Sequence, residues 1–290
     1  MPDSVLRAMD LHIGKRVAGL LQGDYRSASL GGGTELAQIR VYEPGDDVRQ
    51  IDWNVTARMG QPHVRVQVAE RVLTTWLLLD SSPSMNFGTA DRRKADVAEG
   101  VAIAIGHIAT RRGNRLGLVS FGDGSPRTLP PRQGRSGMIG LLTALHQEPE
   151  KRSDPSLSLG AAMRNVGRFA SWSKLIVIVS DFRGARDWRV PLLELAGRHE
   201  VLCVEIRDPR EQELPNVGEL WLVDPESGRQ LRVDTSKRKL RERFAEAAQA
   251  ERGEVAGLIA ESGARHIVLS TQGDWLRTFV AAAGQKGVRR

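Results

Sequence analysis

Two kinds of apolar pattern alternate along most of this 290-residue chain. Short runs that are apolar at almost every position predict buried strands at residues 72–79, 115–121, 174–180, 200–207 and 265–270. Segments in which apolar residues recur at helical spacing predict helices at residues 91–111, 138–145, 157–170, 188–198, 236–262 and 274–283. Strands without polar alternation are typical of a sheet that is covered on both faces. The pattern therefore predicts an α/β fold, with a doubly wound and mostly parallel sheet flanked by helices.

Other stretches do not follow this alternation. Helical spacing predicts an amphipathic helix at residues 4–23, and the three consecutive glycines at residues 31–33 predict a flexible turn after it. A loop rich in proline and arginine is expected at residues 122–137, and a β-hairpin is expected as an insertion near residues 218–235. We interpret residues 1–71 as an N-terminal collar that packs on one larger domain, residues 72–290.

The first strand of that domain is followed at once by three oxygen-bearing side chains at alternate positions, Asp80, Ser82 and Ser84. In open α/β sheets, ligands bind beyond the carboxyl ends of the strands. Hard oxygen donors suit Mg²⁺ or Mn²⁺ better than zinc, which prefers nitrogen and sulfur. The alternative is that one of these side chains caps the N-terminus of the next helix.

The Asp-x-Ser-x-Ser spacing resembles the metal-ion-dependent adhesion site of von Willebrand factor A (vWA) domains. That resemblance implies two further residues, a carboxylate at the end of another strand and a threonine from a later loop. Asp181, which ends the strand predicted at residues 174–180, fits the first. At the threonine position the chain has Leu157, so Ser156 or Ser158 could supply the oxygen from a shifted loop, or the site has lost a ligand. We expect weak cation binding, with a dissociation constant on the order of millimolar, and expect Leu157→Thr to strengthen it if the loop lies at the site.

A second block of residues precedes the domain and resembles the signature of the DUF58 family, whose members join such a block to a vWA domain. Its residues are Arg40, Tyr42, Pro44, Gly45, Asp46, Asp47, Arg49, Asp52, Trp53 and Arg58. Because charges beside a buried aromatic ring need partners, we expect Trp53 to be at least half buried and Arg49 or Arg58 to pair with a carboxylate of the block. The alternative is that the acids face solvent as a docking surface.

Composition narrows the possible partners and compartment. The formal net charge is +7, but the basic residues, including residues 92–94, are scattered and interleaved with acids, and aromatic residues make up only 5% of the chain. This favours a solvated surface over a specific nucleic-acid site. No apolar stretch approaches the length of a membrane span. The single cysteine, Cys203, forms no internal disulfide, which indicates the cytoplasm.

These observations favour a binding protein over an enzyme, because no nucleophile elbow, phosphate-binding lysine motif or paired His and Cys is present in the sequence. The family resemblance implies a metal-assisted, protein-binding adaptor that works with a MoxR-type AAA+ ATPase on client proteins. Two alternatives stay open at this point. One is a metal-dependent, phosphate-handling enzyme that uses Asp80, Ser82 and Asp181, and the other is a scaffold whose metal site has decayed.

Overall fold

The computed structural model describes residues 30–68, 72–111, 113–122, 127–146, 157–170 and 175–283. The described residues fall into two compact units, a smaller one that ends at Val72 and a larger one that begins at Leu73. The helix predicted at residues 4–23 lies outside the described residues. The packing of a collar on the larger domain stays a prediction.

The larger unit is built on a six-stranded sheet with the strand order β10-β7-β6-β3-β4-β5. Its strands are β3 (Thr74–Asp80), β4 (Arg115–Phe121), β5 (Arg127–Gln133), β6 (Leu175–Ser180), β7 (Glu200–Arg207) and β10 (Arg265–Ser270). All neighbours pair in parallel except β4 and β5, which are antiparallel. The predicted α/β fold, with a mostly parallel and doubly wound sheet, is confirmed.

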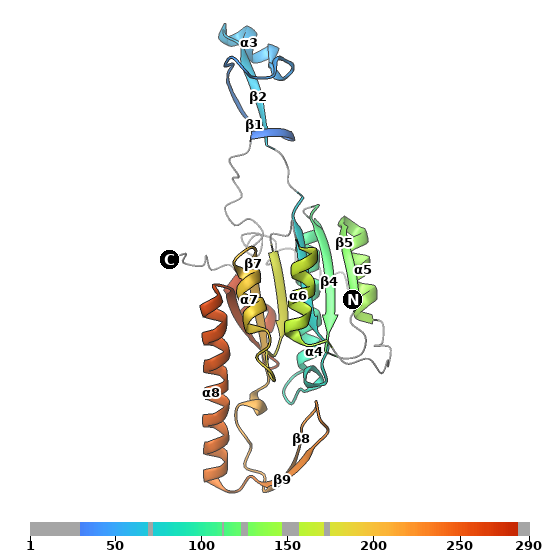
Figure 1. The fold of residues 1–290 in the computed structure, drawn as a ribbon, viewed down its shortest axis with the longest axis vertical. Helices are drawn as coiled ribbons and strands as arrows, with labels where there is room; N and C mark the ends of the chain where they lie inside the picture. The colour runs from blue at the N-terminus through green and yellow to red at the C-terminus, as the bar shows by residue number, and fades with distance from the viewer. Residues whose placement is uncertain are drawn as a thin grey trace. The chain divides into compact units, whose positions relative to one another are not determined.

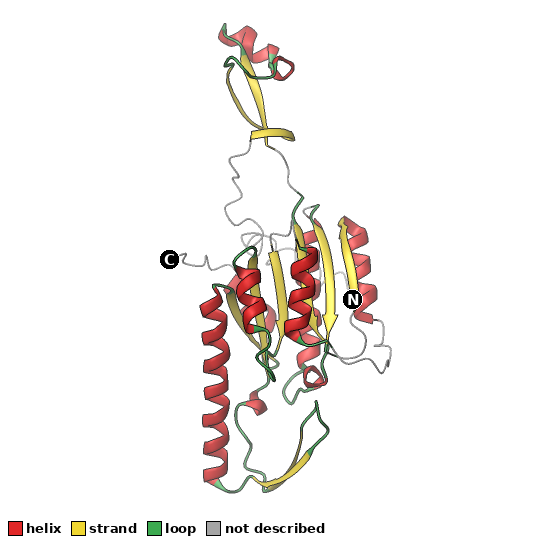
Figure 2. Ribbon diagram, in the orientation of Figure 1, coloured by secondary structure: helices red, strands yellow, loops and turns green. Residues whose placement is uncertain are grey.

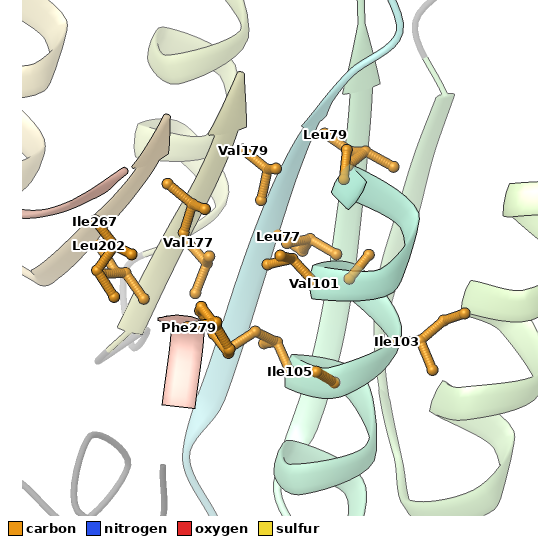
Figure 3. Close-up of a cluster of buried hydrophobic side chains, with 14 of the residues drawn as sticks. Leu77, Leu79, Val101, Ile103, Ile105, Val177, Val179, Leu202, Ile267 and Phe279 are labelled. Carbon is orange, nitrogen blue, oxygen red and sulfur yellow. The ribbon is translucent and has the colours of Figure 1, made fainter. Parts of the chain in front are cut away.

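Helices cover both faces of this sheet (Figures 1 and 2). One face carries α4 (Lys94–Arg111), α5 (Gly134–His146) and α9 (Trp275–Ala283), and the other carries α6 (Leu159–Phe169), α7 (Arg189–Ala196) and α8 (Arg238–Ser262). Figure 3 shows how Val101 and Ile105 of α4 pack towards Leu77 of β3 and Val177 of β6. Burial on both faces explains why these central strands are apolar throughout.

Cys203 lies in the middle of β7 and has no exposed surface. Burial raises the pKa of its thiol far above the ordinary value, and the nearby Glu205 carboxylate adds to that shift. The residue is therefore a small apolar core side chain, as its sequence context predicts.

The structure has a strand of the central sheet in a segment predicted as loop, and it has a hairpin where one is predicted. The loop expected at residues 122–137 contains β5, an edge strand in which Pro130 and Pro131 are tolerated because an edge strand has one side without ladder hydrogen bonds. The hairpin at residues 218–235 consists of β8 (Glu219–Val223) and β9 (Gln230–Asp234), which pair in antiparallel register. It extends beyond the carboxyl edge of the parallel strands, as does the first part of α8 (Figure 1).

The smaller unit is a long hairpin with one helix. Strand β1 (Leu30–Val41) pairs with β2 (His63–Val68), and a short 3-10 helix, η1 (Val48–Gln50), and α3 (Trp53–Met59) lie between them. The turn predicted at residues 31–33 is wrong, because these glycines belong to β1. The pairing register shifts between Leu30 and Glu35, and glycine is typical of such irregular strand positions.

The signature block lies in this smaller unit and is held by two Arg–carboxylate pairs. Arg40 donates to Asp46 Oδ1 at 2.5 Å, and Arg65 Nε donates to Asp52 Oδ2 at 2.8 Å. Asp52 also caps α3, accepting from two backbone amides, and Asp47 caps η1. The acids are therefore used to fix the backbone of the block.

Two expectations for the block are corrected by these contacts. Trp53 is 70% exposed. It is the first residue of α3, and the side chain that is buried here belongs to the preceding residue, Asp52. Within the described part of the chain neither Arg49 nor Arg58 forms an ion pair, since Arg40 and Arg65 occupy the carboxylates of Asp46 and Asp52. Tyr42 is partly buried, with its backbone amide bonded to Pro62, and Pro44 and Gly45 form the exposed turn with φ of +114° at Gly45.

Candidate functional site

The site lies where β3 and β6 end side by side. These strands are parallel and in register, with Leu79 opposite Val179, so Asp80 comes beside Ser180. Asp80 Oδ2 accepts a hydrogen bond from Ser180 Oγ at 2.5 Å, and its Oδ1 accepts from the backbone amide of Ser82 at 2.8 Å. The Asp80 carboxylate is thus held in place by neutral donors, almost out of contact with solvent.

The two serines after Asp80 face each other. Ser82 Oγ and Ser84 Oγ are 3.0 Å apart, and a short 3-10 helix, η2 (Pro83–Asn86), begins between them. The Ser82 side chain makes no capping hydrogen bond to η2. Helix capping, the alternative interpretation of this spacing, therefore does not describe Ser82.

Gly122, which follows β4, leaves room for this loop. Its φ is +102°, and a Cβ atom at this position would lie 2.6 Å from the backbone nitrogen of Ser82 and 2.9 Å from Asp80 Oδ1. A side chain here would push the loop away from the strand end. Sequence reasoning did not identify Gly122, although a glycine directly after a buried strand is a signal for close backbone approach.

Asp181 follows β6 and has a different partner. Its Oδ2 accepts from Lys94 Nζ at 2.7 Å, and the same ammonium donates to Glu211 Oε1 at 2.7 Å. Its Oδ1 accepts from the amide of Arg183 at 3.0 Å. A hydrogen bond with the Ser84 side chain also lowers the pKa of Asp181 and links this carboxylate to the serine pair. The structure thus brings Asp80, Ser82, Ser84 and Asp181 into one network at the carboxyl edge.

The two carboxyl groups of this network have opposite pKa shifts. Burial raises the pKa of Asp80 to about 6, and the negative charge of Asp181 contributes to the increase, while hydrogen bonds from Ser180 and Ser82 oppose it. Burial acts in the same direction on Asp181, but the charge and hydrogen bond of Lys94, together with hydrogen bonds from the Arg183 amide and Ser84, lower the pKa of that group. Asp181 is therefore ionised and paired, whereas burial disfavours the ionised form of Asp80 near neutral pH.

Lys94 is the residue that sequence reasoning missed. Its position in a basic run with Arg92 and Arg93 predicts a solvated side chain, but the side chain is fully buried. Its place at the start of α4 depends on a distant contact, since Asp208 after β7 accepts from Thr89 N at 2.8 Å and from Thr89 Oγ1 at 2.5 Å. These two hydrogen bonds hold the segment before α4 against the sheet edge, and no sequence pattern predicts them.

The later loop does not bring Ser158 to this network. Ser158 caps α6, accepting from Ala161 N at 3.2 Å and donating to Asp187 Oδ2 at 2.6 Å. Leu157 is partly buried and packs against the apolar cluster on the α6 side of the sheet. Ser156 lies outside the described residues. The serine that was considered as a replacement ligand therefore serves as a helix cap.

A carboxylate from the hairpin does reach the network. Glu226, between β8 and β9, accepts a hydrogen bond from the backbone amide of Ser84 at 3.0 Å. The two residues are 142 positions apart in the sequence. The hairpin thus touches the same loop that presents the serine pair.

The oxygen atoms at the edge fit a hard divalent cation in type. Ser82 and Ser84 present adjacent hydroxyls, each with more lone pairs than the bond between them uses, and two carboxylates lie behind them. Across the described ranges, no group of three or more His, Cys, Asp and Glu residues gathers in the manner of a metal centre. Lys94 also occupies one oxygen of Asp181 and adds positive charge. The donor set is therefore compatible with weak binding of Mg²⁺ or Mn²⁺, mainly through the hydroxyls.

None of the helices in the described ranges combines the length and the apolar character required to cross a membrane.

Comparison with known proteins places the chain in a family. Uncharacterized proteins of Mycobacterium tuberculosis (Rv1480) and Mycobacterium bovis (Mb1516) are each 40% identical over 279 residues, which cover 96% of this chain and 87% of theirs. Solved structures with some similarity include the hypothetical protein BatB of Bacteroides thetaiotaomicron, with a TM-score of 0.48 at 14% identity over 72% of this chain and 96% of that one. The SpRpn10 VWA domain has a TM-score of 0.42 at 15% identity over 76% and 100% of the two chains. These structural similarities are too low to support a functional argument. The family model described as "Protein of unknown function DUF58" matches residues 38–254, and the chain belongs to that family.

Proposed function

We propose that the chain binds other proteins at the carboxyl edge of its sheet, assisted by Mg²⁺ or Mn²⁺ held by Ser82 and Ser84. The observation that carries the proposal is the network in which Asp80, Ser82, Ser84 and Asp181 converge, with the two hydroxyls 3.0 Å apart. A bound cation would supply positive charge that attracts a carboxylate of the partner. Ligands in open α/β sheets bind at this edge.

Each residue of the network has a separate part in this function. Ser82 and Ser84 present the hydroxyl oxygens, and Asp80, whose partners are all neutral donors, supplies negative charge that a cation would stabilise. Lys94 neutralises Asp181 and limits the affinity for the cation. Cation and partner then strengthen each other's binding, because coupling between two ligands is reciprocal.

The partners are a MoxR-type AAA+ ATPase and its client proteins in the cytoplasm, as the resemblance to DUF58 proteins implies. In this role the chain is an adaptor and has no catalytic step of its own. The phosphate-handling alternative is less well supported, because Asp80 is almost completely buried. A nucleophilic carboxylate must be able to reach its substrate.

The test is an affinity pull-down from native extract with Mg²⁺ or with EDTA. We expect the double variant Ser82→Ala/Ser84→Ala to lose Mg²⁺-dependent partners, including the ATPase. Ser81→Ala is the matched control, because the Ser81 hydroxyl donates to the Phe121 carbonyl at 2.8 Å and not to the serine pair. Recovery of the same proteins by the double variant, or in EDTA, contradicts the proposal.

A second measurement examines the cation without a partner. Titration of the purified protein with Mn²⁺, followed by electron paramagnetic resonance, should show weak binding that the double serine variant loses and Ser81→Ala keeps. Binding of equal strength in all three proteins would place the cation elsewhere. Complete absence of binding in the wild type would favour the scaffold alternative.

A further inference from the structure

We propose that Glu226, at the tip of the β8–β9 hairpin, is an internal ligand of the carboxyl-edge site and holds the position that a partner's carboxylate takes. This inference rests on the proposed function, because it assumes that the edge recognises an acidic side chain. The partner is then a protein that presents a glutamate or aspartate on a tight turn, and it binds by displacing the hairpin tip.

The contact joins Glu226 to the same loop atoms that form the proposed site. The carboxylate accepts from Ser84 N at 3.0 Å, and the hydroxyl of the same residue is 3.0 Å from Ser82 Oγ. A backbone amide beside two hydroxyls can bind a carboxylate from this chain or from a partner, because these donors interact with the carboxylate group alone. Figure 1 shows the hairpin reaching this end of the sheet from its insertion before α8.

The tip has a defined shape that presents Glu226. Asp224 N donates to Arg229 O at 2.9 Å, and Gly228 N donates to Asp224 O at 2.8 Å. The Asp224 side chain accepts from Glu226 N at 3.1 Å and also from the Ser227 hydroxyl. An aspartate that bonds the backbone two residues later is typical of a tight turn. Glu226 is thus displayed from an ordered turn, as a short acidic epitope is.

The rest of the hairpin is built so that the tip can leave. Its base is fixed, since Thr235 is fully buried and donates to Gly218 O at 2.7 Å. Its strands are exposed, with Trp221 at 61% and Leu231 at 62%. An isolated two-stranded hairpin is only marginally stable. The exposed hydrogen bond at Ser84 can therefore break without disturbing the core.

Charge makes the docked state responsive to a cation. Asp80 and Asp181 lie in the same network, and Lys94 is already shared between Asp181 and Glu211. A further carboxylate brought to this edge raises the negative charge there. A cation on Ser82 and Ser84 therefore favours docking of Glu226, and it equally favours a partner's carboxylate, so the two compete for one position.

The first experiment measures hydrogen exchange of the Ser84 amide by NMR in the full-length protein. Glu226→Ala removes the acceptor, and we expect exchange at Ser84 to become at least about tenfold faster, since the opened amide loses its protection. The matched control is Glu219→Gln, a change on the same hairpin at a residue that pairs with Arg232 across its base. Exchange that is unchanged in Glu226→Ala, or equally faster in the control, overturns the proposal.

The second experiment uses a synthetic cyclised peptide of residues 219–234 as the probe, in the presence of Mg²⁺. If the tip occupies the site for nine-tenths of the time, its removal raises the apparent affinity about tenfold, so Glu226→Ala protein should bind the peptide more tightly than wild type by that factor. A peptide with Gln in place of Glu226 should bind neither protein. Equal binding to both proteins, or binding to neither, overturns the proposal.

The two proposals fail in different ways. If Ser82→Ala/Ser84→Ala loses its cellular partners but Glu226→Ala alters neither exchange nor peptide binding, the edge is a partner site without an internal ligand. If the double serine variant keeps every partner, the proposed function fails, whatever Glu226 does.

Discussion

The ends of β3 and β6 show how two neighbouring carboxylates of the same burial come to differ. Asp80 is 7% exposed and Asp181 is 6% exposed, and their strands are adjacent in the sheet. The pKa of Asp80 is nevertheless raised to about 6, while that of Asp181 is lowered. Burial acts in the same direction on both, so the partner decides the sign. Neutral donors face Asp80, whereas an ammonium faces Asp181.

Because of this difference, the two carboxylates have different roles at the carboxyl edge of the sheet. Asp181 is already compensated, so it fixes α4 to the sheet through Lys94. Asp80 is not compensated, so it has the most to gain from an external cation. A symmetrical arrangement, with a lysine for each carboxylate, would leave no charge to attract an ion.

Removal of the Lys94 ammonium should abolish the difference between Asp80 and Asp181, and we expect it to cause the largest loss of stability. Lys94→Met leaves Asp181 buried without its cation, while Glu211 keeps only its pair with Arg183. Breaking a buried pair in this way costs about 3–5 kcal/mol. Urea denaturation at pH 7.5 measures the free energy of unfolding. Arg93→Met, which removes a pair with the partly exposed Asp96, is the control and should change stability by less than about 0.5 kcal/mol. A loss below about 1 kcal/mol for Lys94→Met would show that Asp181 does not depend on the ammonium.

A methyl group added at Gly122 should disturb the loop beside Asp80 and leave the surroundings of Asp181 unchanged. Gly122→Ala forces a left-handed backbone position and a contact 2.6 Å from Ser82 N, so we expect a loss of about 2–3 kcal/mol, together with weaker Mn²⁺ binding. Gly134→Ala is the matched control, because its φ is also positive, at +57°, but no atom lies within 4 Å of the added Cβ. Equal losses in the two variants would assign the whole effect to backbone strain.

Neutralising each carboxylate in turn should change stability in opposite directions with pH. Because the folded-state pKa of Asp80 is raised from 3.8 to about 6, its ionised form opposes folding above pH 6 and this cost is absent below about pH 4. Asp80→Asn should therefore stabilise the protein at pH 7.5, by about 2 kcal/mol, and the gain should shrink as the pH falls through 6.

Asp181→Asn is the opposing arm of this test. The pKa of Asp181 is lowered in the folded state, so its contribution to stability is present above pH 3.8 and is lost as the pH falls through the lower, folded-state value. We expect the variant to be less stable at pH 7.5 and the loss to narrow in acid. Thermal unfolding measured from about pH 2 to pH 8 checks both variants, because the Asp181 window lies below pH 3.8. Parallel profiles for the two would contradict the contrast.

The smallest effect is expected at Leu157. The residue packs against the apolar cluster on the α6 side, so Leu157→Thr should cost about 1 kcal/mol through lost burial. Since the adjacent Ser158 bonds to Asp187 and not to the serine pair, we expect no gain in Mn²⁺ affinity. Titration of the variant by electron paramagnetic resonance measures this directly, and tighter binding would restore the loop as a source of ligands.

Much of the larger unit could be predicted from periodicity, because strands buried on both faces are apolar at every position. The convergence of Asp80 and Asp181 followed from the same pattern, since parallel strands end at one edge. Strand β5 was missed because its two prolines are read as loop signals, and only its edge position makes them acceptable. The strands and α3 of the smaller unit were missed because dense turn residues hide their short periods.

Contacts across long sequence distances could not be predicted at all. Lys94 meets residues 87 and 117 positions away, and Glu226 meets Ser84 over 142 positions. A lysine in a basic run and a glutamate in a turn both look like solvated surface residues. Trp53 shows the reverse error, because an aromatic side chain among charges was assumed to be covered, yet it stands on the exposed side of α3.

The burial of Cys203 has a practical value for anyone who follows the hairpin in solution. Thiol reagents attack the thiolate, and this thiol is enclosed in the sheet with a strongly raised pKa, so the native chain offers maleimides and iodoacetamides almost nothing to modify. A cysteine introduced at the exposed position of Trp221 would then be the one fast-reacting thiol. A spin label or fluorophore could be attached there in a single step, without first removing the cysteine that nature provided.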